Sequence, residues 1–133
     1  MKRVSQLTAL ALLCGLASLS CMAADMPHSL TLAQLQEQHG AAIDTRASAF
    51  YNGWPQTLSG PSGHEPAALN LSATWLSAMS DDQIARWAKQ HQLTPTTPLA
   101  LYGSDADNQA VSARLRKAGY TRISLLSDAL QAL

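Results

Sequence analysis

Two cysteines, Cys14 and Cys21, carry all the thiols of this 133-residue chain, and both lie near its amino terminus. A thiolate can act as a nucleophile or as a strong zinc ligand, so the fate of these two residues decides which chemistry is open to the rest of the chain. Residues 24–133 contain no cysteine. If the amino-terminal segment is removed, the remaining domain has no nucleophilic thiol, no thiolate metal ligand and no disulfide.

The amino-terminal segment has the pattern of an export signal. Lys2 and Arg3 precede an apolar run over residues 7–19, and Ala23 supplies a small residue for cleavage. The apolar run is shorter than the roughly 20 residues that a membrane-spanning helix needs. We therefore expect residues 1–23 to be a signal peptide that is cleaved near Ala23, and the mature protein to be periplasmic.

A lipid anchor on Cys21 is the alternative use of this signal. Lipoprotein signals usually carry leucine three residues before the cysteine, and this chain has Ser18 there. This difference favours the soluble exported form, which loses both thiols.

The remaining residues with chemical potential are histidines and a polar run after residue 102. The histidines, His28, His39, His64 and His91, lack the paired spacing of a metal site, so we expect neither a metal nor a cofactor. The polar run consists of Gly103, Ser104, Asp105, Ala106, Asp107 and Asn108. Acidic and amide side chains often cap helices, so we expect a loop here whose Asp105, Asp107 and Asn108 cap the following helix.

Composition argues against two broad classes of partner. Nine Lys and Arg balance nine Asp and Glu over the full chain and form no basic stripe, so nucleic-acid binding is not expected. No stretch of residues 24–133 is apolar for long enough to cross a membrane. The length suffices for one domain with one core.

Three helices are predicted from their starting residues and apolar spacing. Thr31 and Ser80 each stand three residues before a glutamine, which is the spacing of a capping box. A third helix follows the polar run, with Val111 and Leu115 on its inward face and Gly119 at its end.

Short apolar runs between these helices predict four strands, centred near Ile43, Leu69, Leu101 and Ile123. The expected ranges are 41–44, 67–71, 99–102 and 122–126, with a polar lead up to His28 and a loop over residues 51–63. Strands that alternate with helices indicate an α/β domain with a mostly parallel sheet.

Three segments in this order resemble the rhodanese-like (thiosulfate sulfurtransferase) family. They are Ile43-Asp44-Thr45-Arg46, then Gly63-His64-Glu65-Pro66-Ala67-Ala68-Leu69-Asn70, and finally the strand and helix from Leu101 to Gly119. The first resembles the family's Asp-x-Arg strand ending, the second its Gly-His-Ile-Pro-Gly-Ala-x-Asn signature, and the third its active-site strand and helix.

The resemblance implies a three-layer α/β domain with a mostly parallel central sheet over residues 24–133. It also gives structural roles to the motif residues Asp44, Arg46, Gly63, His64, Pro66 and Asn70. We expect Asp44 and Arg46 to form an ion pair or turn contact, and His64 to anchor a loop rather than act as a base. Trp54 and Trp75 are expected in loop packing.

In this family, a cysteine at the end of a central strand carries sulfur from a donor such as thiosulfate to a thiophilic acceptor. The resemblance places Gly103 at that position, and glycine cannot be a nucleophile. Asp105 and Asp107 put negative charge where the family binds an anionic donor. The resemblance therefore implies a degenerate active site with no catalytic residue.

Three functions follow from this resemblance. The favoured one is a catalytically silent scaffold or docking module for other rhodanese domains in the same chain or for a protein partner. A second is part of a thiosulfate sulfurtransferase whose cysteine lies beyond Leu133, because family domains usually continue past their last strand and this one looks C-terminally truncated. A third is a stand-alone domain that binds a ligand or partner in the empty loop pocket. We expect the chain alone to be inactive.

Overall fold

The computed structural model describes residues 28–54 and 63–129 of the chain. These residues form a five-stranded parallel sheet with the strand order β1-β5-β4-β2-β3. The strands are β1 (His28–Leu30), β2 (Ala41–Asp44), β3 (Leu69–Asn70), β4 (Leu99–Tyr102) and β5 (Ile123–Leu126). The helices are α1 (Leu32–Glu37), α2 (Ser48–Tyr51), the 3-10 helix η3 (Ala73–Ala78), α3 (Asp81–Gln90) and α4 (Asp105–Lys117).

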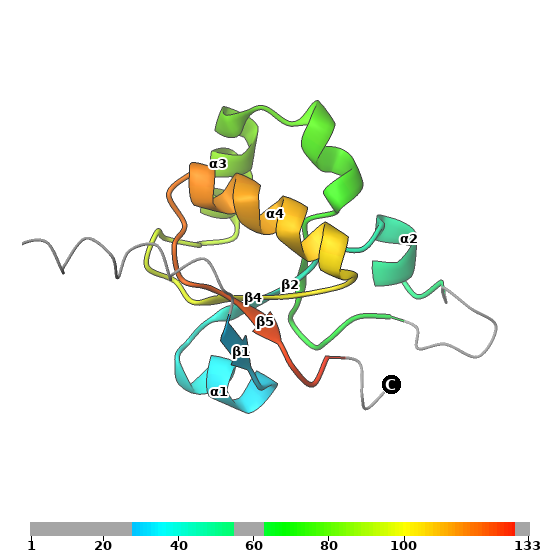
Figure 1. Cartoon of the computed structure of the whole chain (residues 1–133), viewed down its shortest axis with the longest axis vertical. Coiled ribbons are helices and arrows are strands. Elements are labelled where there is room, and N and C mark those ends of the chain that lie inside the picture. Colours follow the sequence, from blue (N-terminus) through cyan, green and yellow to red (C-terminus); the bar gives the residue numbers. More distant parts are fainter. Residues whose placement is uncertain (1–27, 55–62, 130–133) are drawn as a thin grey trace, which may run out of the picture.

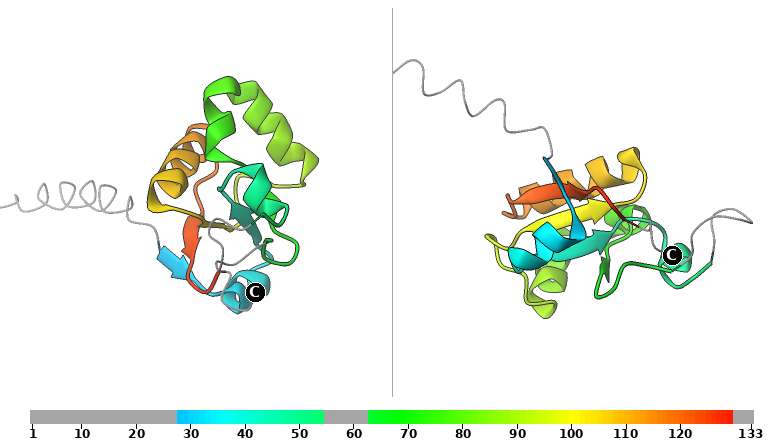
Figure 2. Two further views of the ribbon diagram at one scale, coloured as in Figure 1. Left: turned by 90° about the vertical axis from the view of Figure 1, so that its right-hand side faces the viewer. Right: turned by 90° about the horizontal axis from the view of Figure 1, so that it is seen from below.

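Helices cover both faces of the sheet. Figures 1 and 2 show α1 on one face and α3 and α4 on the other. The residues of β4 alternate between the two cores: Leu99 and Leu101 pack on the α3 and α4 side, and Ala100 and Tyr102 on the α1 side. Successive side chains of a strand point to opposite faces, so an unbroken apolar run belongs to a strand that is covered on both sides. The predicted three-layer α/β architecture is confirmed.

Local sequence sets where two of these helices begin. The Thr31 hydroxyl oxygen accepts the Gln34 N–H at 3.1 Å, and Gln34 Oε1 accepts the Thr31 N–H at 2.9 Å. Ser80 and Gln83 form the same reciprocal pair at 3.2 and 2.7 Å. Each box satisfies backbone donors that a helix start leaves unpaired.

The structure differs from the predicted elements at several places, and it contains α2 and η3, for which no helix was predicted. His28 begins an edge strand, β1, whose register pairs it with Ser124 of β5, so the polar lead is wrong. A three-residue strand is too short to show alternation, and its partner lies far away in the sequence. The strand expected over 67–71 contains Leu69–Asn70 alone, because Ala67 has a φ of 62° that no strand residue adopts. Residue 51 ends α2, and residues 55–62 of the expected loop lie outside the described residues.

No helix within the described ranges combines the length and the apolar character that crossing a membrane requires. The predicted signal peptide, with both cysteines, also lies outside those ranges.

Candidate functional site

Position 103 lies at the carboxyl end of β4, directly before α4. Ser104 is the N-cap of this helix, and its Oγ accepts the Asp107 N–H at 3.1 Å. Asp105 and Asp107 therefore lie in the first helical turn, where their negative charge interacts favourably with the positive end of the helix dipole. The loop expected over 103–108 is wrong from Asp105 onward, and so is the expectation that Asp105, Asp107 and Asn108 cap the helix. Ser104 takes that position because its short hydroxyl reaches the third N–H of the turn.

The space beside Gly103 is already filled. Gly103 has a φ of +148°, and a Cβ built on it would overlap the hydroxyl oxygen of Thr45. Thr45 is fully buried. Its Oγ1 lies 3.1 Å from the Tyr102 carbonyl oxygen and 2.8 Å from Oδ1 of Asn108, and its single proton can be donated to one of them at a time. Thr45 therefore occupies the volume that any side chain at position 103 would need.

Asp44 and Arg46 form a buried ion pair at the carboxyl end of β2. Arg46 Nη2 lies 2.6 Å from Asp44 Oδ2, and Nε lies 2.9 Å from Oδ1. Burial disfavours the charged guanidinium, but the hydrogen bonds and charge of Asp44 outweigh burial, so the pKa of Arg46 is raised. Nη1 of Arg46 is buried and has no hydrogen-bond partner among the described residues. The two contacts between the carboxylate and the guanidinium fix both side chains at the end of β2, as expected of a structural ion pair.

This ion pair holds the neighbouring loop. Arg46 Nη2 donates to the Gly63 carbonyl oxygen at 2.6 Å. Asn70 Nδ2 donates to the carbonyl oxygens of Asp44 and Arg46 at 2.9 and 3.0 Å. Gly63 is thus held through its carbonyl oxygen by the Arg46 side chain, and Asn70 is held through its side-chain amide by two backbone carbonyl groups at the end of β2.

His64 contacts α2 rather than the β4–α4 junction. Its Nδ1 lies 2.8 Å from the Tyr51 carbonyl oxygen, and its ring stacks on the Tyr51 ring with centroids 3.8 Å apart. Pro66, two residues later, is exposed. The structure therefore brings together Asp44, Arg46 and Gly103 with its polar neighbours, and places His64 and Pro66 outside that group.

Tyr102 contacts both the Asp44–Arg46 ion pair and the segment that contains Glu65. Its hydroxyl oxygen accepts the Glu65 N–H at 2.9 Å, and the Arg46 guanidinium carbon lies 5.7 Å from the ring centroid. Burial raises the pKa of Tyr102 well above its ordinary value, and the negative charge of Asp44 adds to the rise. The phenol is therefore a neutral, fixed part of the site.

An open cleft of about 460 Å³ lies between β4, the start of α4 and the segment after β5. Among the residues that line it are Arg46, Tyr102, Gly103, Asp105, Asn108 and Ser127. These residues offer guanidinium, phenol, carboxylate, amide and hydroxyl groups. No thiol lies within the described ranges, and no cluster of three His, Cys, Asp or Glu side chains suited to a metal ion is found there. The described residues of the cleft can bind polar groups, and none of them carries a thiol.

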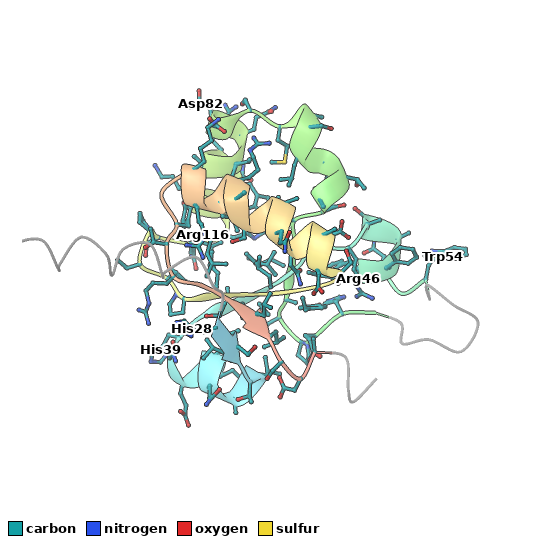
Figure 3. The ribbon with its side chains drawn as sticks, viewed as in Figure 1. His28, His39, Arg46, Trp54, Asp82 and Arg116 are labelled. Atoms are coloured by element: carbon teal, nitrogen blue, oxygen red, sulfur yellow. The ribbon has the colours of Figure 1, made fainter. Side chains whose placement is uncertain are left out.

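Sequence reasoning missed the two residues that most define this site. Thr45 and Tyr102 lie inside the segments singled out above, yet neither had a predicted role. Thr45 is the middle residue of the Asp-x-Arg motif and Tyr102 directly precedes Gly103, and these positions are the signal that could have found them. The expectation for the tryptophans is wrong: Trp54 is 70% exposed and Trp75 40% exposed, so neither is packed into a loop. Figure 3 shows Trp54 at the edge of the molecule, beyond α2.

Comparison with known proteins places this geometry in context. The model of the family described as Rhodanese-like domain matches residues 29–133. Thiosulfate sulfurtransferase YnjE from Escherichia coli (strain K12) is 65% identical over 130 residues, which is 98% of this chain and 30% of that protein. The crystal structure of YnjE superposes with a TM-score of 0.77 and 64% identity, over 80% of this chain and 26% of that one.

A more distant likeness concerns the fold alone. The wildtype structure of EanB is 24% identical, with a TM-score of 0.64, over 77% of this chain and 24% of that one. In each of these comparisons the chain spans less than a third of the protein or structure that it matches.

Proposed function

The chain belongs to the rhodanese-like domain family, and from that premise we propose that it is a catalytically silent rhodanese module with a scaffold or docking role. The observation that carries the proposal is the closed position at the end of β4. By resemblance to the family, Gly103 takes the position of the sulfur-carrying cysteine, and in the structure the Thr45 hydroxyl fills the space beside it. Glycine has no side chain, and the Thr45 hydroxyl occupies the space that a side chain at position 103 would need.

The chemistry supports silence. Sulfur transfer through a protein persulfide needs a thiolate that attacks the donor and holds the transferred sulfur. In the described residues the groups nearest to Gly103 are the Thr45 hydroxyl and the Asn108 amide, and both are engaged with each other. Neither is acidic enough to replace a thiolate at neutral pH.

Two observations support a docking role. The chain covers 30% of the length of the sulfurtransferase that it resembles, so in a protein of that size other domains would lie beside it. Trp54 and Trp75 expose large aromatic surfaces, and tryptophan is enriched among the residues that dominate binding at interfaces. We therefore propose other rhodanese domains in the same chain, or a protein partner, as the surface that this module meets.

Silence is tested by asking whether the purified mature domain, residues 24–133, takes up sulfur, since leaving out residues 1–23 removes Cys14 and Cys21. Incubation with thiosulfate and cyanide should give thiocyanate at the buffer rate, and intact-mass measurement after thiosulfate alone should show no added sulfur. Thiocyanate turnover together with a sulfur adduct on the chain would refute the proposal. The matched control is an active rhodanese in the same buffer, which must give both signals.

A second candidate is that the chain is part of a thiosulfate sulfurtransferase whose cysteine lies in a later domain. The 65% identity to YnjE favours this reading. Reading the gene past the codon for Leu133 tests it directly. A following rhodanese domain with a cysteine at the end of its central strand supports the candidate, and a stop codon with no such domain downstream refutes it.

Export is the remaining part of the proposal. The basic start, apolar run and small residues near Ala23 support a signal peptide and a periplasmic mature protein. Amino-terminal sequencing of protein from the periplasmic fraction should begin near Ala24. An intact Met1, or lipid attached to Cys21, would contradict it.

A further inference from the structure

A second pocket, of about 430 Å³, opens at the amino ends of β4 and β5 beside β1. Its walls include His28, Gln38, Pro98, Arg116, Arg122 and Ile123. In Figure 3, Arg116 and His28 lie at the left, on the side of the molecule away from Arg46. The pocket is therefore separate from the cleft at Gly103.

Two arginines give this pocket its character. Arg122 donates to the Thr96 carbonyl oxygen at 3.3 Å and to Gln38 Oε1 at 3.4 Å, and both acceptors are neutral. Arg116 uses Nε to reach the Ser112 hydroxyl at 3.3 Å. Among the residues that the structure describes, no Asp or Glu lines the pocket, and no ion pair includes Arg116 or Arg122. Within the described ranges, two guanidinium groups thus border one pocket and neither forms an ion pair with a carboxylate.

Other cations of the same helix behave differently. Arg114 and Lys117 both reach Asp81 at 3.4 Å, and Arg114 also donates to the carbonyl oxygens of Leu76 and Met79. Their positive charge is compensated within the fold, and they also suit the negative end of the α4 dipole. Arg116 lies on another side of α4, where it lines the pocket. Among the described residues it forms no ion pair, and it does not bind the carbonyl groups of η3 as Arg114 does.

We propose that this pocket binds a small organic anion that carries a carboxylate or phosphate group. The planar guanidinium presents paired N–H donors that match the oxygens of either group. Leu30, Pro98 and Ile123 add apolar surface for the body of the ligand. The volume lies within the range of about 300–1,000 Å³ that small-molecule sites occupy.

The site does not depend on the silent-domain proposal. Helix α4 begins at Asp105 and ends at Lys117, so at about 1.5 Å per residue its two ends lie roughly 18 Å apart. An anion held at the pocket would leave the groups around Gly103 untouched. Binding can therefore be present or absent whatever the sulfurtransferase assays show.

The test is a titration of the purified, isotopically labelled chain with phenyl phosphate and with benzoate, followed by NMR. Benzyl alcohol is the neutral control with a similar ring, and inorganic phosphate is the control without an apolar body. We expect saturable shifts of the Arg116 and Arg122 side-chain Nε–Hε signals and of the backbone amides of Ser29 and Ser124. The dissociation constant should be about 1 mM or tighter for at least one of the two ring-bearing anions. The arm that binds more tightly distinguishes a carboxylate from a phosphate ligand.

Charge-removing variants then locate the site. Arg116→Gln and Arg122→Gln should each weaken binding about tenfold or more, because each removes a charge-assisted hydrogen-bond donor. Arg86→Gln is the matched control: Arg86 is exposed on α3 and does not line the pocket, so binding should not change. Arg116→Lys keeps the charge without the planar fork and should bind with intermediate affinity. The proposal requires all variants to keep the parent's circular dichroism spectrum, and Arg116→Lys provides a second reading if Arg116→Gln unfolds.

Three results would overturn the proposal. One is the absence of saturable shifts with either ring-bearing anion. Another is equal weakening by Arg86→Gln, which would indicate diffuse charge attraction. A third is a set of shifts confined to residues 103–108, which would place the anion at the other end of α4.

Discussion

Replacing Gly103 with alanine should destabilise the domain strongly, although it adds a single methyl group. The added Cβ would overlap the Thr45 hydroxyl, and φ at this position is +148°. A side chain held at positive φ costs about 1–3 kcal/mol. Displacing the buried Thr45 hydroxyl from its hydrogen bond costs about 1 kcal/mol more, and overpacking costs a similar amount. We expect the free energy of unfolding to fall by about 3 kcal/mol or more.

Urea unfolding, followed by circular dichroism, measures this change, and Gly119→Ala is the matched control. Gly119 also has a positive φ, +103°, but nothing lies within 4 Å of a Cβ built there. Replacing Gly119 with alanine should therefore cost only the strain of a side chain at positive φ, about 1–2 kcal/mol. The difference between the two variants isolates the overlap with Thr45.

A double-mutant cycle with Thr45→Ala separates overlap from other effects. Thr45→Ala removes Oγ1, the atom that a Cβ at position 103 would meet. The double variant should therefore be less destabilised than the sum of the two single variants. Strict additivity, or a Gly103→Ala cost equal to that of Gly119→Ala, would refute the argument that Thr45 closes this position.

The same geometry predicts the outcome of placing a cysteine at position 103. Gly103→Cys should give little thiocyanate, because the thiol meets Thr45, and Asp105 and Asp107 favour its protonated form and repel an anionic donor. Adding Thr45→Ala and replacing both aspartates with glycine should help more than the cysteine alone. Robust turnover by Gly103→Cys by itself would contradict this reasoning.

Three further predictions concern the framework of the site. Asp44→Asn should lower the free energy of unfolding by about 3–5 kcal/mol, because it leaves the buried guanidinium of Arg46 without its counter-charge; urea unfolding at neutral pH measures this, and a loss under 1 kcal/mol would contradict a buried pair. Folding raises the pKa of Tyr102 above its ordinary value of about 10, so the stability that the neutral phenol contributes is present below pH 10 and is lost as the pH rises above 10. Tyr102→Phe should therefore reduce the fall in the free energy of unfolding at alkaline pH. An unchanged slope would contradict a raised pKa for Tyr102. Ser80→Ala should lower the free energy of unfolding by about 1 kcal/mol, because it removes the hydroxyl oxygen that accepts the Gln83 N–H at the start of α3. Ser77→Ala, at an exposed position, is the near-neutral control.

Much of the fold could be predicted from the sequence, because the relevant signals are local. Apolar runs such as 99–102 identify strands buried on both faces, and the glutamines three residues after Thr31 and Ser80 mark helix starts that the structure contains. The alternation of these elements was enough to predict a parallel α/β sheet. The sequence also determined that Gly103 offers no nucleophile, since this depends on residue identity alone.

The tertiary structure alone decided how position 103 is closed and which arginines of the described ranges form no ion pair. Thr45 and Gly103 come from different strand ends, and their encounter depends on the register in which β2 pairs with β4. The β1 edge strand and the arginine-lined pocket likewise join segments far apart along the chain. Capping and apolar periodicity act within a few residues and can be found in a linear pattern. Side-chain overlap and charge compensation depend on distances in space, and those are set only when the strands pair and the helices pack.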